Sequence, residues 1–216
     1  CDMCISEEGE VKRYRFYSAV IHSHARLTYK KVYSLIEGKD KTLKQQYGNF
    51  LPYLDSFYSL YQTLLQQRKK RGALDFDTPE VKVEFGSNKK IKRLYTMVRN
   101  DAHRLIEECM LCANVSAAAF LLKHKTDSLF RVHDGPKAEK FNDLKIFLGE
   151  LGLSIGGGDL PHPSDYAKLI DKVTGRPDGN VIQTILLRSL SQAYYSPEKE
   201  GHFGLAYDQY THFTSP

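Results

Sequence analysis

Apolar side chains recur at steps of three and four over two long stretches, the spacing of helices that bury one face. The first stretch runs from Pro52 to Lys70 and carries an aromatic stripe, with proline at a favourable first turn and Gly72 as a stop. The second runs from the capping residue Asn100 to about Lys123. Because its second half is apolar almost all round, we expect this helix to be buried.

The same spacing predicts four shorter helices. One begins after Thr28, a suitable N-cap, and ends at Gly38. The other three cover residues 137–151, 164–173 and 179–195.

Alternating apolar and polar residues predict strands elsewhere. Residues 81–98 read as a hairpin around the turn Gly86-Ser87-Asn88. Residues 1–22 read as another, whose second strand would run from Tyr14 to His22, and Leu129–His133 reads as a short strand. Together the pattern predicts an α+β (mixed α/β) fold in one domain, with helices packed around a mostly antiparallel sheet.

Charge and aromatic content narrow the function. The 216 residues include 31 Lys and Arg against 26 Asp and Glu, a net charge of +5, and basic residues gather at 12–15, 68–71 and 89–93. These groups suit either solvated helix ends and strand edges or a polyanion. The 14 Tyr and 11 Phe interleaved with them suit single-stranded nucleic acid, which is held by base stacking and phosphate neutralisation.

Neither a signal peptide nor a run of about 18 apolar residues is evident in the sequence, so we expect no membrane role and a cytoplasmic location.

The four cysteines form two C-x-x-C pairs, a spacing that zinc sites use. However, Cys109 and Cys112 lie inside the long predicted helix, and Cys1 and Cys4 lie in a predicted strand, where positions three apart face opposite sides. We therefore expect buried apolar thiols, and a zinc-stabilised helical domain is the weaker alternative.

No complete catalytic constellation is visible. Asp75 and Asp77 flank Phe76 and could share a strand face, but two carboxylates are too few for two-metal phosphodiester hydrolysis. The eight histidines are scattered, which favours structural roles over general-base catalysis. Phe76 itself, judged by pattern alone, is a core strand residue.

Several blocks, in order along the whole chain, resemble the RNB catalytic domain of the RNase II and RNase R exoribonucleases, and RNase R in particular. The blocks are Ser23–Tyr29, Arg99–His103, Ile106–Met110, Ala113–Ala118, Phe130–Asp134, Leu186–Ser189, Gly201–Ala206 and Tyr210–Pro216.

The resemblance implies processive, Mg²⁺-dependent hydrolysis of RNA from its 3′ end to nucleoside 5′-monophosphates. It also implies that the metal-binding aspartates precede Cys1, that a basic arginine-bearing segment follows Pro216, and that cold-shock and S1 modules flank the domain. None of these lies within the chain, so we expect residues 1–216 to be an internal, incomplete part of the domain. Such a part would have no catalytic or metal-binding residue of its own and would be inactive alone.

The resemblance assigns RNA contacts to three residues. Phe76 matches one aromatic of a base clamp whose tyrosine partner would lie upstream of Cys1. Tyr29 matches a second RNA-contacting tyrosine. Glu107, with Glu108 as the one-residue alternative, matches a glutamate near the sugar and base of the terminal nucleotide. The alternative function is a non-catalytic RNA- or protein-binding module with an inactive RNB fold.

Overall fold

The computed structural model describes residues 1–76 and 80–214 and has the expected α+β character. Its helices are α1 (Tyr29–Ile36), α2 (Lys41–Tyr47), α3 (Leu51–Arg71), α4 (Asp101–Lys123), α5 (Ala138–Glu150), α6 (Pro163–Val173) and α7 (Gly179–Ser189), with 3₁₀ turns η1 (Gly48–Phe50) and η2 (Phe203–Leu205). Its strands are β1 (Asp2–Ile5), β2 (Val11–Arg15), β3 (Glu80–Phe85), β4 (Ile91–Met97), β5 (Phe130–Val132) and β6 (Tyr194–Ser196).

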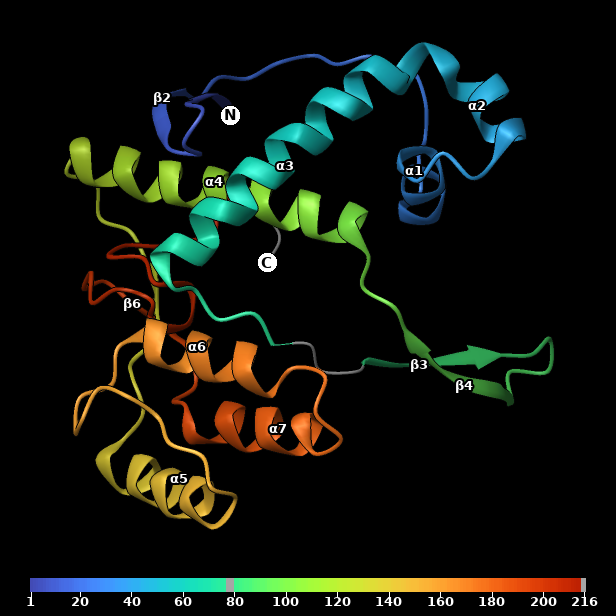
Figure 1. Ribbon diagram of the computed structural model, residues 1–216. Coiled ribbons are helices and arrows are strands. Elements are labelled where there is room, and N and C mark those ends of the chain that lie inside the picture. Colours follow the sequence, from blue (N-terminus) through green and yellow to red (C-terminus); the bar gives the residue numbers. More distant parts are fainter. Residues whose placement is uncertain (77–79, 215–216) are drawn as a thin grey trace.

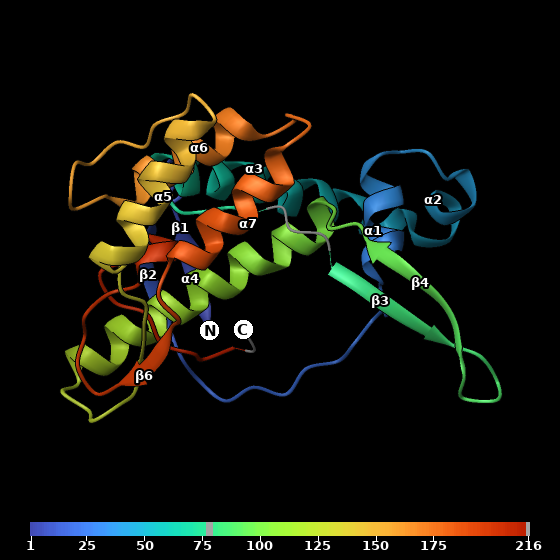
Figure 2. The ribbon, with the colours of Figure 1, turned by 90° about the horizontal axis from the view of Figure 1, so that it is seen from below.

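Two long helices organise the molecule. α3 and α4 cross each other, α1 and α2 lie beyond the beginning of α3, and α5, α6 and α7 gather beside its end (Figure 1). Viewed from below, the β3–β4 hairpin extends away from the helices (Figure 2). The hydroxyls of Tyr58 and Tyr61 on α3 donate to the carboxylate of Asp101 on α4, at 3.1 and 3.3 Å. These bonds tie the two helices together near the start of α4.

The strands of the described residues do not form one sheet, which corrects that part of the prediction. They form three separate antiparallel pairs, β1 with β2, β3 with β4, and β5 with β6. Each pair is short, and the projecting β3–β4 pair exposes apolar side chains such as Val83 and Leu94. With no broad apolar face to join them, the pairs stay apart.

Several of the residues predicted to begin or end the helices do so in the structure. Thr28 caps α1, Asn100 caps α4 together with the side chain of His103, and Gly72 ends α3 in the left-handed conformation at φ +79°. A side chain at Gly72 would also collide with Ser164, whose Cβ would lie at 2.8 Å and Cα at 3.0 Å. The predicted bounds of the two long helices and of the 81–98 hairpin are confirmed to within one or two residues.

Three boundaries were wrong, and one helix was missed. The strand predicted from Tyr14 begins earlier, at Val11. β2 ends at Arg15 because its partner β1 has only four residues, so nothing pairs with a strand continuing to His22. α7 ends at Ser189 because Tyr194–Ser196 pairs with β5. The short α2, capped by the side chain of Asp40, is too polar to show an apolar stripe.

The largest apolar cluster lies among α5, α6 and α7. Its fully buried side chains include Leu148, Tyr166, Val173, Ile182 and Leu186. Burial of such side chains contributes about 1.5–3 kcal/mol each, so this cluster provides a rigid base for the segment that follows α3.

By length and composition, α4 is the one helix of the described residues that could cross a membrane, which corrects the expectation that no stretch is apolar enough. Half of that stretch is buried inside the molecule, including Ala117 and Ala118. This burial fits the predicted core helix.

Asn114, in the middle of α4, fastens the last described residues to this helix. It is fully buried; its Nδ2 donates to the hydroxyl of Tyr210 at 2.8 Å. Its Oδ1 accepts the backbone N–H groups of Phe213 and Thr214 at 2.9 and 2.8 Å. One buried amide side chain therefore bonds three groups of this segment at once, the buried hydroxyl of Tyr210 and two partly buried backbone N–H groups.

We predict that Asn114→Ala releases this segment, since each buried group left unpaired costs about 1–3 kcal/mol. Hydrogen exchange of the full-length protein, read by mass spectrometry over residues 207–214, should become faster. The exposed Asn142→Ala on α5 is the matched control. Equal protection in the two variants would contradict the assignment.

Candidate nucleic-acid interface

A pocket of about 840 Å³ lies where α1, the end of β4 and the start of α4 meet. It is lined by residues 28–30 and Tyr33, by residues 95–101, and by His103 and Arg104. Its walls combine aromatic rings with the cations Lys30, Arg99 and Arg104, the mixture that single-stranded nucleic acid requires.

Two stacked rings form part of the wall. Tyr29, the first residue of α1, stacks on His103 with ring centroids 4.0 Å apart and an angle of 24° between the planes. The N-caps of their helices fix both residues in first turns. Burial lowers the pKa of His103, so its ring is neutral at neutral pH. Tyr29 is 45% exposed, which leaves ring surface available in the pocket.

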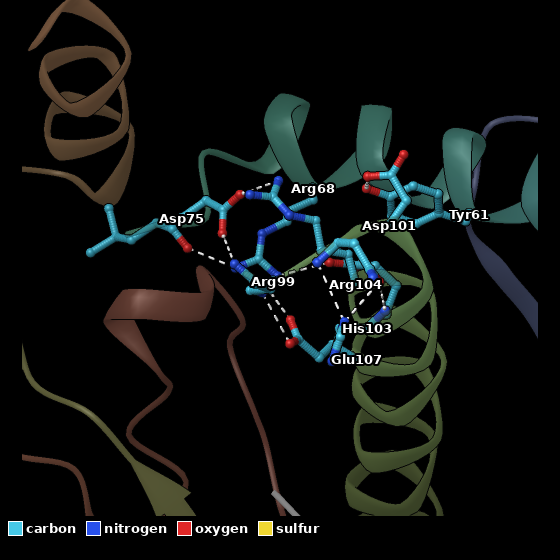
Figure 3. A network of polar contacts seen from close by, with 11 residues as sticks. Tyr61, Arg68, Asp75, Arg99, Asp101, His103, Arg104 and Glu107 are labelled. Atoms are coloured by element: carbon cyan, nitrogen blue, oxygen red, sulfur yellow. Dashed lines mark hydrogen bonds and ion pairs between the residues drawn. The ribbon is translucent and has the colours of Figure 1, made fainter. Parts of the chain in front are cut away.

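Arg99 is the centre of a polar network beside this pocket (Figure 3). Its Nη1 donates to Oδ1 of Asp75 at 2.8 Å. Its Nε donates to Oε1 of Glu107 at 3.0 Å, and its Nη2 contacts Oε2 of the same carboxylate. Arg104 adds a contact to Oδ2 of Asp75 at 3.1 Å. Two arginines and two carboxylates thus balance in charge.

This network changes the interpretation of Asp75. Burial raises the pKa of Asp75, but the hydrogen bond from Arg99 and the charges of Arg68 and Arg104 outweigh it and lower that pKa overall. The carboxylate is therefore ionised and committed to arginines rather than turned towards a metal. Asp77, its suggested companion, lies outside the described residues.

The two neighbouring glutamates have different environments. Glu108 is 5% exposed, and its carboxylate accepts from Nη1 of Arg68 at 2.8 Å. The side chain of Glu107 is 42% exposed, and its oxygens have further lone pairs beyond those used by Arg99. Glu107 is therefore the accessible one of the two.

Phe76 follows Asp75 directly but does not line the pocket of Tyr29. It is half-buried and packs against the apolar cluster of α5, α6 and α7. The structure thus brings Tyr29 and Glu107 near one pocket, whose wall holds their partners His103 and Arg99. It does not bring the Phe76 side chain to that pocket; Phe76 is linked to the network only as the chain neighbour of Asp75. Both Phe76 and Glu107 keep exposed surface.

The four basic residues at the end of α3, Arg68 to Arg71, differ in exposure and in their partners. Lys69 and Lys70 are exposed, as a solvated helix end requires. Arg68 is 8% exposed and ion-paired. Arg71 lies over the ring of Tyr207 at 3.9 Å and donates to the carbonyl of Leu205. The two arginines of this run are therefore structural.

The remaining polar candidates are also structural. His133 bridges the carbonyl of Ser191 and the N–H of Gly204, and burial lowers the pKa of His202 to about 4. Burial raises the pKa of Cys109 to about 11 and that of Cys112 to about 12, so both thiols stay protonated at neutral pH. The expectation of buried thiols is wrong for Cys1 and Cys4, which are exposed because the short β1–β2 pair does not cover them. Within residues 1–76 and 80–214, no three His, Cys, Asp or Glu side chains gather as a metal site would require.

Sequence reasoning missed Arg99 as a site residue, although one signal was present. A positive charge just before a helix N-cap opposes the helix dipole, so such an arginine needs carboxylate partners. Those partners, Asp75 and Glu107, lie 24 and 8 positions away.

Comparison with known proteins assigns this chain to a family. The RNB domain model matches residues 1–216. Ribonuclease R of Escherichia coli is 47% identical over 216 residues, which are 100% of this chain and 26% of that protein. The chain therefore spans about a quarter of the length of this relative.

Solved structures agree with this. Apo RNase R of Mycoplasma genitalium superposes on this chain with a TM-score of 0.89 at 27% identity. The matched region is 99% of this chain and 33% of the M. genitalium chain. RNase R of the same organism in complex with ribose-methylated single-stranded RNA gives the same values. The chain belongs to the RNB domain family, and its similarity to these Ribonuclease R proteins extends over its whole length.

Proposed function

We propose that this chain is part of a processive 3′→5′ exoribonuclease that hydrolyses RNA to nucleoside 5′-monophosphates. The observation that carries the proposal is the pocket in which Tyr29, Arg99 and His103 meet beside Glu107. Its rings can stack bases, and Lys30 in its wall, which is outside the network of Arg99 and Arg104, can neutralise a phosphate. The RNA bound in the M. genitalium relative supports RNA as the substrate.

The chain's own residues would bind and orient the single-stranded 3′ end. Phe76 and Tyr29 would present ring faces to bases, and the exposed carboxylate of Glu107 would accept a hydrogen bond from a ribose 2′-hydroxyl, the group that distinguishes RNA from DNA. A grip on ring faces suits one strand, because paired bases in a duplex already stack on each other.

The described residues do not fit a Mg²⁺ site, since Asp75 is neutralised by two arginines and no other carboxylate cluster is formed among them. The proposal therefore assigns Mg²⁺ to aspartates outside residues 1–216, and with it the activation of water. We further propose that the enzyme acts in the cytoplasm.

The first test compares the full-length protein with residues 1–216 on a 3′-tailed single-stranded RNA in the presence of Mg²⁺. We expect nucleoside 5′-monophosphates from the full-length protein alone, because residues 1–216 would supply channel and stacking groups without the metal. Inactivity of the full-length protein would favour the non-catalytic RNA- or protein-binding alternative.

A second test addresses Phe76. In the full-length protein, Phe76→Ala should weaken binding of the RNA end by about 1–3 kcal/mol, the contribution of one stacked base, and should lengthen the final products. Phe147→Ala is the matched control, since Phe147 packs against the same apolar cluster. A product ladder that is unchanged, or changed equally by the control, would refute the clamp assignment.

A third test addresses Glu107. Glu107→Gln should reduce the preference of the full-length protein for RNA over the same strand ending in 2′-deoxyribose, because a neutral amide accepts a weaker hydrogen bond than a carboxylate. Glu84→Gln, at a half-buried glutamate of the β3–β4 hairpin that is also paired with an arginine, should leave the preference intact. A Glu107→Gln protein with wild-type discrimination would exclude contact with this hydroxyl.

A further inference from the structure

Consecutive glutamates of α4 each hold an arginine from another part of the chain. Glu107 binds Arg99, which lies just before α4, through two atoms of the guanidinium. Glu108 binds Arg68, near the end of α3, at 2.8 Å. One helix turn thus anchors two separate cations.

Both arginines also donate hydrogen bonds to the segment that follows α3, at the consecutive residues Leu74 and Asp75. Nη2 of Arg68 donates to the carbonyl of Leu74 at 2.7 Å, and Nη1 of Arg99 donates to the carboxylate of Asp75 at 2.8 Å. The N–H of Leu74 is bonded to the carbonyl of Gly204 at 2.8 Å. The backbone is therefore held on several sides immediately before Phe76.

The chemistry of Arg99 suits this bridging position. A guanidinium is planar, always charged and able to donate in two directions at once, whereas an ammonium is a point charge without a fixed fork. Each of the three nitrogens of Arg99 has a carboxylate partner, and its side chain is 24% exposed. This leaves Arg99 better placed to hold protein groups than to bind a phosphate.

We propose that Arg99 is a positioning residue that sets Glu107 and the Phe76 segment in one fixed relation, so that the sugar contact and the base contact are made to the same terminal nucleotide. The proposal rests on the function proposed above and adds to it a coupling between the two contacts. Arg68 and Glu108 support the same segment from the buried side.

The test uses the full-length protein and four variants: Arg99→Lys, Asp75→Asn, Phe76→Ala, and Arg99→Lys combined with Phe76→Ala. Arg99→Lys keeps the charge and loses the fork. A misplaced contact costs up to about 100-fold in rate, so we expect kcat/KM to fall on the order of 10- to 100-fold. Final products should lengthen as in Phe76→Ala, and selectivity against a 2′-deoxy 3′ end should decrease.

The double variant carries the decisive readout. If Arg99 acts through the Phe76 segment, the combined effect on product length should be little larger than that of Phe76→Ala alone, because contacting groups are not additive. Arg93→Lys is the matched control, since Arg93 also pairs with a glutamate, Glu84, but on the exposed hairpin. It should leave product length and sugar selectivity unchanged.

Several results would overturn the inference. Fully additive effects, or a wild-type product ladder in Arg99→Lys while Phe76→Ala changes it, would show that Arg99 does not position the segment. A rise in KM alone, with weaker salt dependence, would make Arg99 a phosphate ligand instead. If Arg99→Lys fails to fold, Asp75→Asn decides by the same readouts, since it preserves shape and removes one carboxylate. Failure of the wild-type protein to release mononucleotides would instead refute the proposed function itself.

Discussion

The ion pairs made by Glu107 and Glu108 are the interactions on which the rest of the site depends. Removing charges from water is costly, and breaking a buried pair by losing one partner costs about 3–5 kcal/mol. The pair of Arg68 and Glu108 is buried on both sides. Such pairs contribute little net stability compared with apolar residues, so their value here lies in fixing where the segment before Phe76 runs.

α4 distributes the functional contacts along one rigid element. Its N-terminal end, capped by Asn100, presents His103 to Tyr29. Its second turn holds the two arginines, and Asn114 in its middle holds the final described residues. Because a helix resists bending, groups that come from distant parts of the sequence keep a constant separation along it.

Most helices and strands could be predicted from signals in a few neighbouring residues. Elements and contacts that depend on partners far away in the sequence could not. The caps at Thr28 and Asn100 and the alternation in β3 are properties of a few neighbouring residues, and these elements were found. β6 was missed because it is a strand only through pairing with β5, some 60 positions earlier. The family resemblance indicated Tyr29, Phe76 and Glu107. The sequence could not show that Arg99 binds both Glu107 and Asp75, the residue before Phe76, because these partners meet only in the folded chain.

The glutamates of α4 hold the segment before Phe76 through their two arginines. Hydrogen exchange of the N–H of Leu74 in a Glu108→Gln variant of the full-length protein tests this most directly. We expect much faster exchange at Leu74 with little change in α5, α6 and α7, because a neutral amide no longer anchors Arg68. Unchanged protection at Leu74 would contradict it.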